Sequence, residues 1–159
     1  MGVRIRKVKS NDIAWIKDVF TQRWGGKFIV SRGKIHRPEE LEGLIDEVGN
    51  KKKGLATFKI IDKEMEIVSL DSLPEKKGIG TRLVKKIISL AKRKKLKRIW
   101  LITTNDNLKA LGFWQKNGFS LVKVYPNALE ISRKLKPDIP LIGAGEIPLR
   151  DEIELEMKL

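Results

Sequence analysis

The sequence predicts an α/β fold in a single domain spanning residues 1–159, with a central mixed, mostly antiparallel sheet of about six to seven strands flanked by helices. Three observations support this prediction. A chain of 159 residues fits one ordinary domain. Apolar residues recur with a period of two from Leu44 to Leu73, and the period changes to that of a helix beyond Gly78. Farther along, strand and helix patterns alternate, which is typical of α/β proteins.

The N-terminal segment predicts a strand followed by a helix. Val3 to Val8 alternates apolar and basic residues, as a strand with one buried face does. Ser10-Asn11-Asp12 then offers side chains that cap a helix. Ile13, Ile16, Val19 and Phe20 follow helical spacing, and the helix is expected to end at Trp24-Gly25-Gly26.

The next segment leads into three strands. Residues 28–37 are expected to form an ordered connecting loop, and Pro38 is expected to open a short acidic helix near Glu39 to Leu44. Leu44 to Leu73 reads as an antiparallel meander of three strands. Its turns are expected at Gly49-Asn50, running through Lys53, and at Asp62-Lys63.

The remaining elements start with a long amphipathic helix. It begins at the turn Gly78-Ile79-Gly80 and carries an apolar stripe opposite a basic one. The order strand, helix, strand, helix, strand places ligand sites at strand ends. The elements that follow are expected as a buried strand at 99–104, a helix from Asn107 to Asn117, a strand at 119–125, a short helix at 127–136, an irregular stretch at 137–148 and a closing strand at 151–159.

Composition excludes several classes of site. The chain has no cysteine, which excludes disulfides, thiolate metal sites and a Cys nucleophile, and its single histidine, His36, cannot build a usual zinc site. We therefore expect no metal. No apolar run approaches the roughly 18 residues that span a bilayer, and the N-terminus lacks the apolar core of a signal peptide. These features predict a cytoplasmic protein with no membrane partner.

The charge points to an anionic partner. The chain has 34 Lys and Arg against 20 Asp and Glu, a net charge of +14, and 11 of the basic residues lie between Lys76 and Arg98 with no acid among them. Such a chain attracts phosphates. A solvated helix face is the structural alternative for this basic run.

A glycine turn from Glu75 to Arg82 lies between a predicted strand and the long helix. Glycines allow backbone amides to approach an anion, and the helix N-terminus adds partial positive charge. The turn is neither a Walker A loop, which needs four residues between its glycines, nor a dinucleotide fingerprint, whose third glycine is missing. A purely structural turn explains two glycines equally well.

A second motif follows the next predicted strand: Asn107, Ala110, Phe113, Trp114, Lys116, Gly118 and Phe119. In order and spacing, the strand, the glycine turn, the basic helix and this motif resemble the GNAT superfamily of N-acetyltransferases, which use acetyl-coenzyme A. The resemblance is strongest from Glu64 to Val124, and the flanking elements also suit that fold. It implies an acyltransferase that moves an acetyl group from acetyl-coenzyme A to a primary amine by direct attack on the thioester.

The resemblance implies a set of coenzyme contacts. Asn107 matches the residue that hydrogen-bonds the pantetheine arm, although capping of its own helix is an equally good role. The strand from Glu64 to Leu73 would expose backbone amides toward the thioester. Glu75 departs from the Gln or Arg of the family pattern and is expected to point away from the diphosphate. The coenzyme is thus expected to contact Leu70, Leu73, Lys77, Gly78, Ile79, Gly80, Thr81, Arg82, Asn107 and Trp114.

Trp114 is the larger departure. It stands where many relatives carry a Tyr that protonates the departing thiolate, and an indole N–H does not give up its proton at working pH. A thiolate is already a fair leaving group, so backbone amides or water could serve it. The chain's only tyrosine, Tyr125, is a candidate substitute, and a packing role is its structural alternative.

The family mechanism also needs a base that takes a proton from the attacking amine. The candidates are Glu66 and Asp71, whose structural alternatives are surface charge and turn capping. His36 is a third candidate because its pKa lies near neutrality.

The sequence specifies the acceptor site less closely than the coenzyme site. Trp24, Arg32 and His36 fall in the segment that borders the acceptor pocket in such proteins. On the closing strand, Glu152, Glu154 and Glu156 share a face. We expect that face to be exposed, and attraction of a cationic acceptor is the alternative.

The partner expected is therefore a small-molecule or peptide amine, with a homodimer left open. The rival hypothesis is a non-catalytic module of the same fold whose basic helix binds nucleic acid or an acidic partner. Trp114 and Glu75 favour that rival, whereas the joint occurrence of both motifs favours the enzyme.

Overall fold

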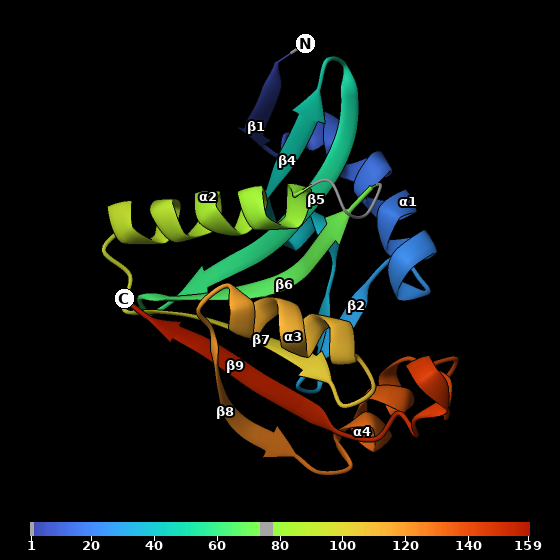
Figure 1. Cartoon of the computed structure of the whole chain (residues 1–159). Coiled ribbons are helices and arrows are strands. Elements are labelled where there is room, and N and C mark those ends of the chain that lie inside the picture. The colour runs from blue at the N-terminus through green and yellow to red at the C-terminus, as the bar shows by residue number, and fades with distance from the viewer. Residues whose placement is uncertain (1, 74–77) are drawn as a thin grey trace.

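The computed structural model describes residues 2–73 and 78–159. Within them, seven strands form one sheet, with helices α2 (Ile79–Arg93) and α3 (Leu108–Lys116) in front of it in Figure 1. Neighbouring strands pair antiparallel except β6 (Glu64–Ser72) and β7 (Arg98–Thr104), which pair parallel, so the predicted mixed, mostly antiparallel sheet is confirmed. In sheet order the strands are β1 (Val3–Lys7), β4 (Glu42–Val48), β5 (Lys51–Ile61), β6 (Glu64–Ser72), β7 (Arg98–Thr104), β9 (Glu152–Lys158) and β8 (Ser120–Tyr125).

Helices cover both faces of this sheet. In the described parts of the chain, no helix is long and apolar enough to cross a membrane. Gly25, at a φ of 74°, ends α1, and Gly78, at a φ of 71°, precedes α2, as their positions in the sequence predict. The α-helices are α1 (Ile13–Trp24), α2 (Ile79–Arg93), α3 (Leu108–Lys116) and α4 (Ala128–Leu135).

Two apolar clusters show which helices cover which face. Leu44 and Ala56 pack in a cluster with α2 and α3, whereas their chain neighbours Ile45 and Leu55 pack with α1. Because successive side chains of a strand point to opposite faces, α2 and α3 cover one face and α1 covers the other. We call these the α2 face and the α1 face.

A bulge in β6 opens the middle of the sheet. Thr57 of β5 pairs with Ser69 and Phe58 pairs with Ile67, so Val68 is an extra residue in β6. A bulge bends its strand and increases the local twist. The parallel pairing of β6 with β7 ends at Ile67 and Leu101, although β6 continues to Ser72 and β7 to Thr104. The two strands therefore diverge beyond the bulge.

The expectation of a connecting loop at residues 28–37 is wrong, because this segment is a hairpin. Strand β2 (Ile29–Ser31) pairs antiparallel with β3 (Lys34–His36). The turn residues Arg32 and Gly33 have φ values of 50° and 70°, as tight hairpin turns require. Arg32 keeps this conformation because the Glu152 carboxylate accepts hydrogen bonds from its backbone N–H, at 3.1 Å, and its guanidinium, at 3.2 Å.

Two smaller expectations are also wrong. The helix expected near Glu39 to Leu44 is a single 3₁₀ turn, Pro38–Glu40, because Glu42 already pairs with Phe58 in the sheet. The turn after β4 does not run through Lys53, because Val48 pairs with Lys51 and β5 begins there. In both places the pairing of neighbouring strands outweighs the local preference of the sequence.

Candidate functional site

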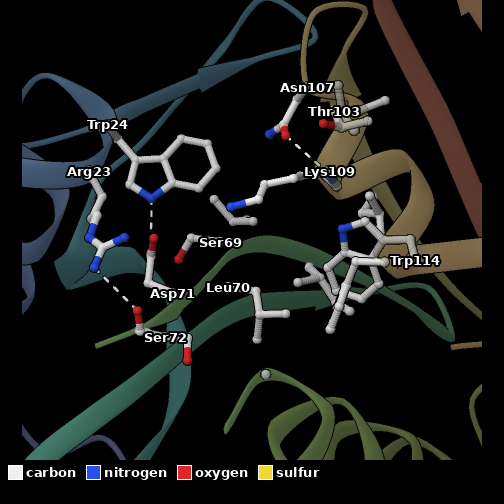
Figure 2. A pocket seen from close by; sticks show the side chains of 17 residues that line it. Arg23, Trp24, Ser69, Leu70, Asp71, Ser72, Thr103, Asn107, Lys109 and Trp114 are labelled. Carbon is white, nitrogen blue, oxygen red and sulfur yellow. Dashed lines mark hydrogen bonds between the residues drawn. The ribbon is translucent and has the colours of Figure 1, made fainter. Parts of the chain in front are cut away.

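A cavity of about 400 Å³ lies where β6 and β7 diverge. Figure 2 shows its lining side chains converging from both strands and from α1 and α3. From β6 it takes residues Ile67 to Ser72, and from β7 it takes Leu101 to Thr103. The remaining lining residues are Arg23, Trp24, Gly80, Asn107, Lys109, Ala110, Phe113 and Trp114.

The cavity reaches both faces of the sheet. Leu70 packs against the apolar cluster on the α2 face, and Gly80 and Phe113 lie on the same face. Asp71, the next residue of β6, pairs with Leu55, which belongs to the α1-side cluster. The opening between β6 and β7 therefore forms a passage through the sheet, with a glycine-containing helix start at one end and a carboxyl group at the other.

The α2 end combines a glycine turn with the first turn of a helix. Gly78 has a left-handed backbone that L residues rarely adopt, and a Cβ atom on Gly80 would lie 3.3 Å from Phe113 Cζ. The predicted residues Gly78, Ile79, Gly80, Thr81 and Arg82 all lie at this helix start, where backbone N–H groups attract anions. Lys77, Lys76 and Glu75 lie outside the described residues.

The other predicted coenzyme residues divide between the cavity and the core. Asn107 lines the cavity and also caps α3, because its Oδ1 accepts a hydrogen bond from the Ala110 backbone at 3.1 Å. Leu70 lines the cavity as well. Leu73 instead packs against the α1-side cluster and does not line the cavity.

Trp114 is nearly buried and forms part of the cavity wall. Its ring meets Phe113 edge to face, with centroids 5.2 Å apart, and Phe119 in the same manner at 5.0 Å. This aromatic cluster fixes the indole plane. The same side chain therefore packs in an aromatic cluster and lines the cavity.

The α1 end of the cavity carries a hydrogen-bonded pair. Trp24 Nε1 donates to Asp71 Oδ2 at 2.9 Å, and Arg23 donates to the Ser72 carbonyl oxygen at 3.2 Å (Figure 2). Burial raises the pKa of Asp71 to about 6, although the Trp24 hydrogen bond and the charge of Arg23 both act to lower it. Asp71 is thus a carboxyl group that changes charge close to neutral pH, beside a cavity.

The structure places Glu66 and His36 together, away from Asp71. Glu66 lines a separate cavity of about 280 Å³ with Lys34, Lys59 and Trp100. His36 Nε2 lies 3.8 Å from Glu66 Oε2, and both side chains are buried. Burial raises the pKa of Glu66 and lowers that of His36 to about 4, so the imidazole is neutral at pH 7.

A third group gathers at the hairpin tip. The Arg32 guanidinium lies 3.5 Å from the centroid of the Tyr125 ring, and the Tyr125 hydroxyl donates to Glu154 at 2.7 Å. Arg32 also holds Glu152, as described above. None of these four side chains lines the cavity between β6 and β7.

The expectation that Glu152, Glu154 and Glu156 form an exposed face is wrong. Glu152 is only 2% exposed, and the guanidinium of Arg98 binds both Glu154 and Glu156. The reason is tertiary: Arg32 of the β2–β3 hairpin covers Glu152, and side chains of the two neighbouring strands, Tyr125 of β8 and Arg98 of β7, hold Glu154. Among the described residues, no group of three or more acidic or His side chains could hold a metal ion.

Several lining residues were not predicted as coenzyme, catalytic or acceptor residues: Arg23, Ser69, Ser72, Thr103, Lys109 and Phe113. Figure 2 shows the Lys109 side chain extended into the cavity beside Trp24. A signal existed for two of them, since Ser69 and Thr103 are polar residues that each directly follow a pair of apolar residues in their strands. Which of these strands lie side by side is a tertiary fact, and the sequence alone does not give it.

Comparison with known proteins identifies the family. The sequence pattern of the Acetyltransferase (GNAT) family matches residues 13–119. The uncharacterised protein YxbD of Bacillus subtilis is 43% identical over 143 residues, covering 88% of this chain and 89% of YxbD.

Solved structures share the fold. An acetyltransferase from Bacillus subtilis in complex with CoA superposes with a TM-score of 0.72 at 22% identity, covering 99% of each chain. A GNAT acetyltransferase from Elizabethkingia anophelis with acetyl-CoA bound gives 0.71 at 22% identity, covering 99% of this chain and 98% of that one. The matched pattern spans the strand, the glycine turn and the Asn107 helix that form the cavity, and the chain therefore belongs to the GNAT family of acetyltransferases.

Proposed function

We propose that the protein transfers an acetyl group from acetyl-coenzyme A to a primary amine by direct attack on the thioester. One observation carries this proposal: a single passage through the sheet joins the glycine-containing start of α2 to the Asp71 carboxyl group. Two substrates that enter from opposite faces would meet between β6 and β7. A direct transfer needs this arrangement because no covalent enzyme intermediate is formed.

The residues at the α2 face fit the coenzyme. The backbone N–H groups of Gly78 to Thr81 and the side chains of Lys77 and Arg82 would hold the diphosphate, and glycines at 78 and 80 allow the close approach that a diphosphate needs. The pantetheine arm would lie along β6 near Leu70, within reach of Asn107. Along a strand, backbone N–H groups point alternately to its two edges. Beyond Ile67, β7 no longer pairs with β6, so N–H groups on that edge of β6 can stabilise the oxyanion.

The residues at the α1 face fit the acceptor. The neutral amine nitrogen attacks the thioester carbonyl carbon, the carbon–sulfur bond breaks, and the coenzyme leaves as its thiolate. Asp71 lies at this end and would take the proton that the amine loses. Glu66 with its neutral partner His36 is the second candidate for this role, and Trp24 would border the acceptor. Arg32 and Tyr125, which meet at the hairpin tip outside this cavity, would act at the acceptor entrance.

Trp114→Tyr tests how the thiolate leaves. The substitution puts a phenol in the aromatic cluster, so folding should be retained and turnover should rise, by about two- to tenfold, if protonation of the thiolate limits the rate. Trp114→Phe is the matched control, because it keeps a ring but offers no proton. Equal turnover in both variants, measured as free thiol released, would show that the thiolate leaves without a side-chain acid.

The proposed function is tested by calorimetry with acetyl-coenzyme A, followed by a panel of primary amines in an assay that reports free thiol. We expect binding that raises the melting temperature, and turnover with at least one amine. Turnover without amine would indicate hydrolysis. Absence of coenzyme binding, together with salt-sensitive binding of RNA, would favour the non-catalytic module.

A further inference from the structure

We infer that Asp46 is a positioning residue that orients the Arg82 guanidinium toward the diphosphate of coenzyme A; this inference rests on the proposed function. Asp46 lies in β4, a strand that contributes nothing to the lining of the cavity between β6 and β7. Its carboxylate accepts a hydrogen bond from Arg82 Nε at 3.1 Å. The contact joins residues 36 positions apart and reaches the first turn of α2.

The sheet makes room for this contact. Asp46 points to the α2 face, since its neighbour Ile45 packs on the α1 face, and it pairs across the sheet with Gly54. A Cβ atom on Gly54 would lie 2.4 Å from Ile79 Cγ2 and 3.4 Å from Asp46 Cβ. The glycine therefore lets α2 dock directly on β5 and leaves space for the arginine to reach the buried carboxylate.

Stability alone does not account for this carboxylate. Asp46 is fully buried, and among the described residues no hydrogen bond reaches its Oδ1. A buried carboxylate with an unpartnered oxygen is costly, and a buried ion pair often stabilises a protein no better than apolar residues of the same size. Orientation of its partner, Arg82, accounts for a buried carboxylate that stability does not explain.

Arg82 is placed to use that orientation. Its side chain is 37% exposed, and its Nη1 lies 3.9 Å from the position that a Cβ atom would take on Gly78. The guanidinium thus runs from a buried anchor at Nε to the glycine turn at the start of α2. Because the guanidinium is fixed there before the ligand binds, binding does not incur the loss of rotamer entropy that a flexible arginine would suffer.

The test compares coenzyme A with pantetheine, the fragment that lacks the diphosphate and the nucleotide, in the native protein and in Asp46→Asn. Calorimetry gives the affinity for coenzyme A, and ligand-observed NMR titration gives that for pantetheine. We expect Asp46→Asn to weaken coenzyme A binding by about five- to tenfold and to leave pantetheine binding unchanged. The ratio of the two affinities does not depend on the fraction of protein that is folded, so partial unfolding cannot imitate the result.

Two further variants sharpen the test. Glu47→Gln is the matched control, because it removes a carboxylate bound to Arg4 and Arg6 at the next position of β4, on the opposite face, and should leave the affinity ratio unchanged. Arg82→Gln should cost less in the Asp46→Asn background than in the native protein, because the two residues act as a unit.

The outcomes separate the two proposals. If the native protein binds coenzyme A and Asp46→Asn binds it equally well, or loses affinity for both ligands in proportion, the positioning role is overturned and the proposed function stands. If the native protein does not bind coenzyme A at all, both proposals fail.

Discussion

Replacing Asp71 with Asn is expected to lower kcat by about 100-fold or more at pH 7.5, the size of effect typical for loss of a general base. The amide keeps an oxygen that can accept the Trp24 hydrogen bond, so the cavity wall should survive. In the native protein, kcat/KM should rise with pH as the Asp71 carboxyl group, whose pKa is raised to about 6, loses its proton. That part of the pH profile should vanish in the variant.

The same substitution should stabilise the protein at neutral pH. Burial raises the pKa of Asp71 from 3.8 to about 6, so between these values the folded state holds a proton that the unfolded state has released. The free energy of unfolding therefore falls as pH rises from about 4 to about 6, by about 3 kcal/mol in all. Asp71→Asn removes this loss, and chemical denaturation at pH 4 and pH 7 measures it.

Glu66→Gln decides between the two carboxyl groups. It removes the other buried carboxyl candidate, which lies in a different cavity. A larger fall in kcat for Glu66→Gln than for Asp71→Asn would transfer the role of base to Glu66 and its partner His36. A fall for Asp71→Asn that came with lower stability at pH 7 would indicate damage to the fold in place of lost chemistry.

Replacing Gly78 and Gly80 together with Val is expected to weaken coenzyme A binding by about 100-fold or more. A valine at position 78 strains a backbone with a φ of 71°, and one at position 80 collides with Phe113, whose Cζ lies 3.3 Å from the added Cβ. Both side chains would keep a phosphate away from the backbone amides. Calorimetry with coenzyme A measures the loss.

Two comparison variants belong with this experiment. Gly80→Ala alone, which adds one methyl group at a tight but adjustable contact, should show an intermediate loss. Replacement of the exposed basic residues Lys85, Lys86, Lys92 and Arg93 with Gln should leave the affinity within a few-fold, because they lie one or more turns beyond the helix start. A steep loss in this last variant would contradict phosphate binding at the start of α2.

Local patterns in the sequence predicted where several helices begin and end. The change from period two to a helical period located α2, the Trp24-Gly25-Gly26 stop ended α1, and Asn107 began α3. These signals are reliable because helix ends and apolar periodicity depend on residues a few positions apart. The resemblance to the GNAT family, and not these local patterns, implied Gly80, Leu70, Asn107 and Trp114 as coenzyme contacts, and the structure brings the four residues together in one cavity.

Contacts between distant segments decided the rest. The hairpin at β2 and β3 depends on Glu152, 120 positions from Arg32, and β9 is internal only because β8 pairs outside it. Asp71 and Glu66 lie five residues apart in one strand, yet the divergence of β6 from β7 puts them in separate cavities. The sequence thus determined the helix boundaries and offered candidate site residues, whereas strand order and the bulge at Val68 decided which of these candidates meet. Pairing partners are set by the whole sheet and not by neighbours along the chain.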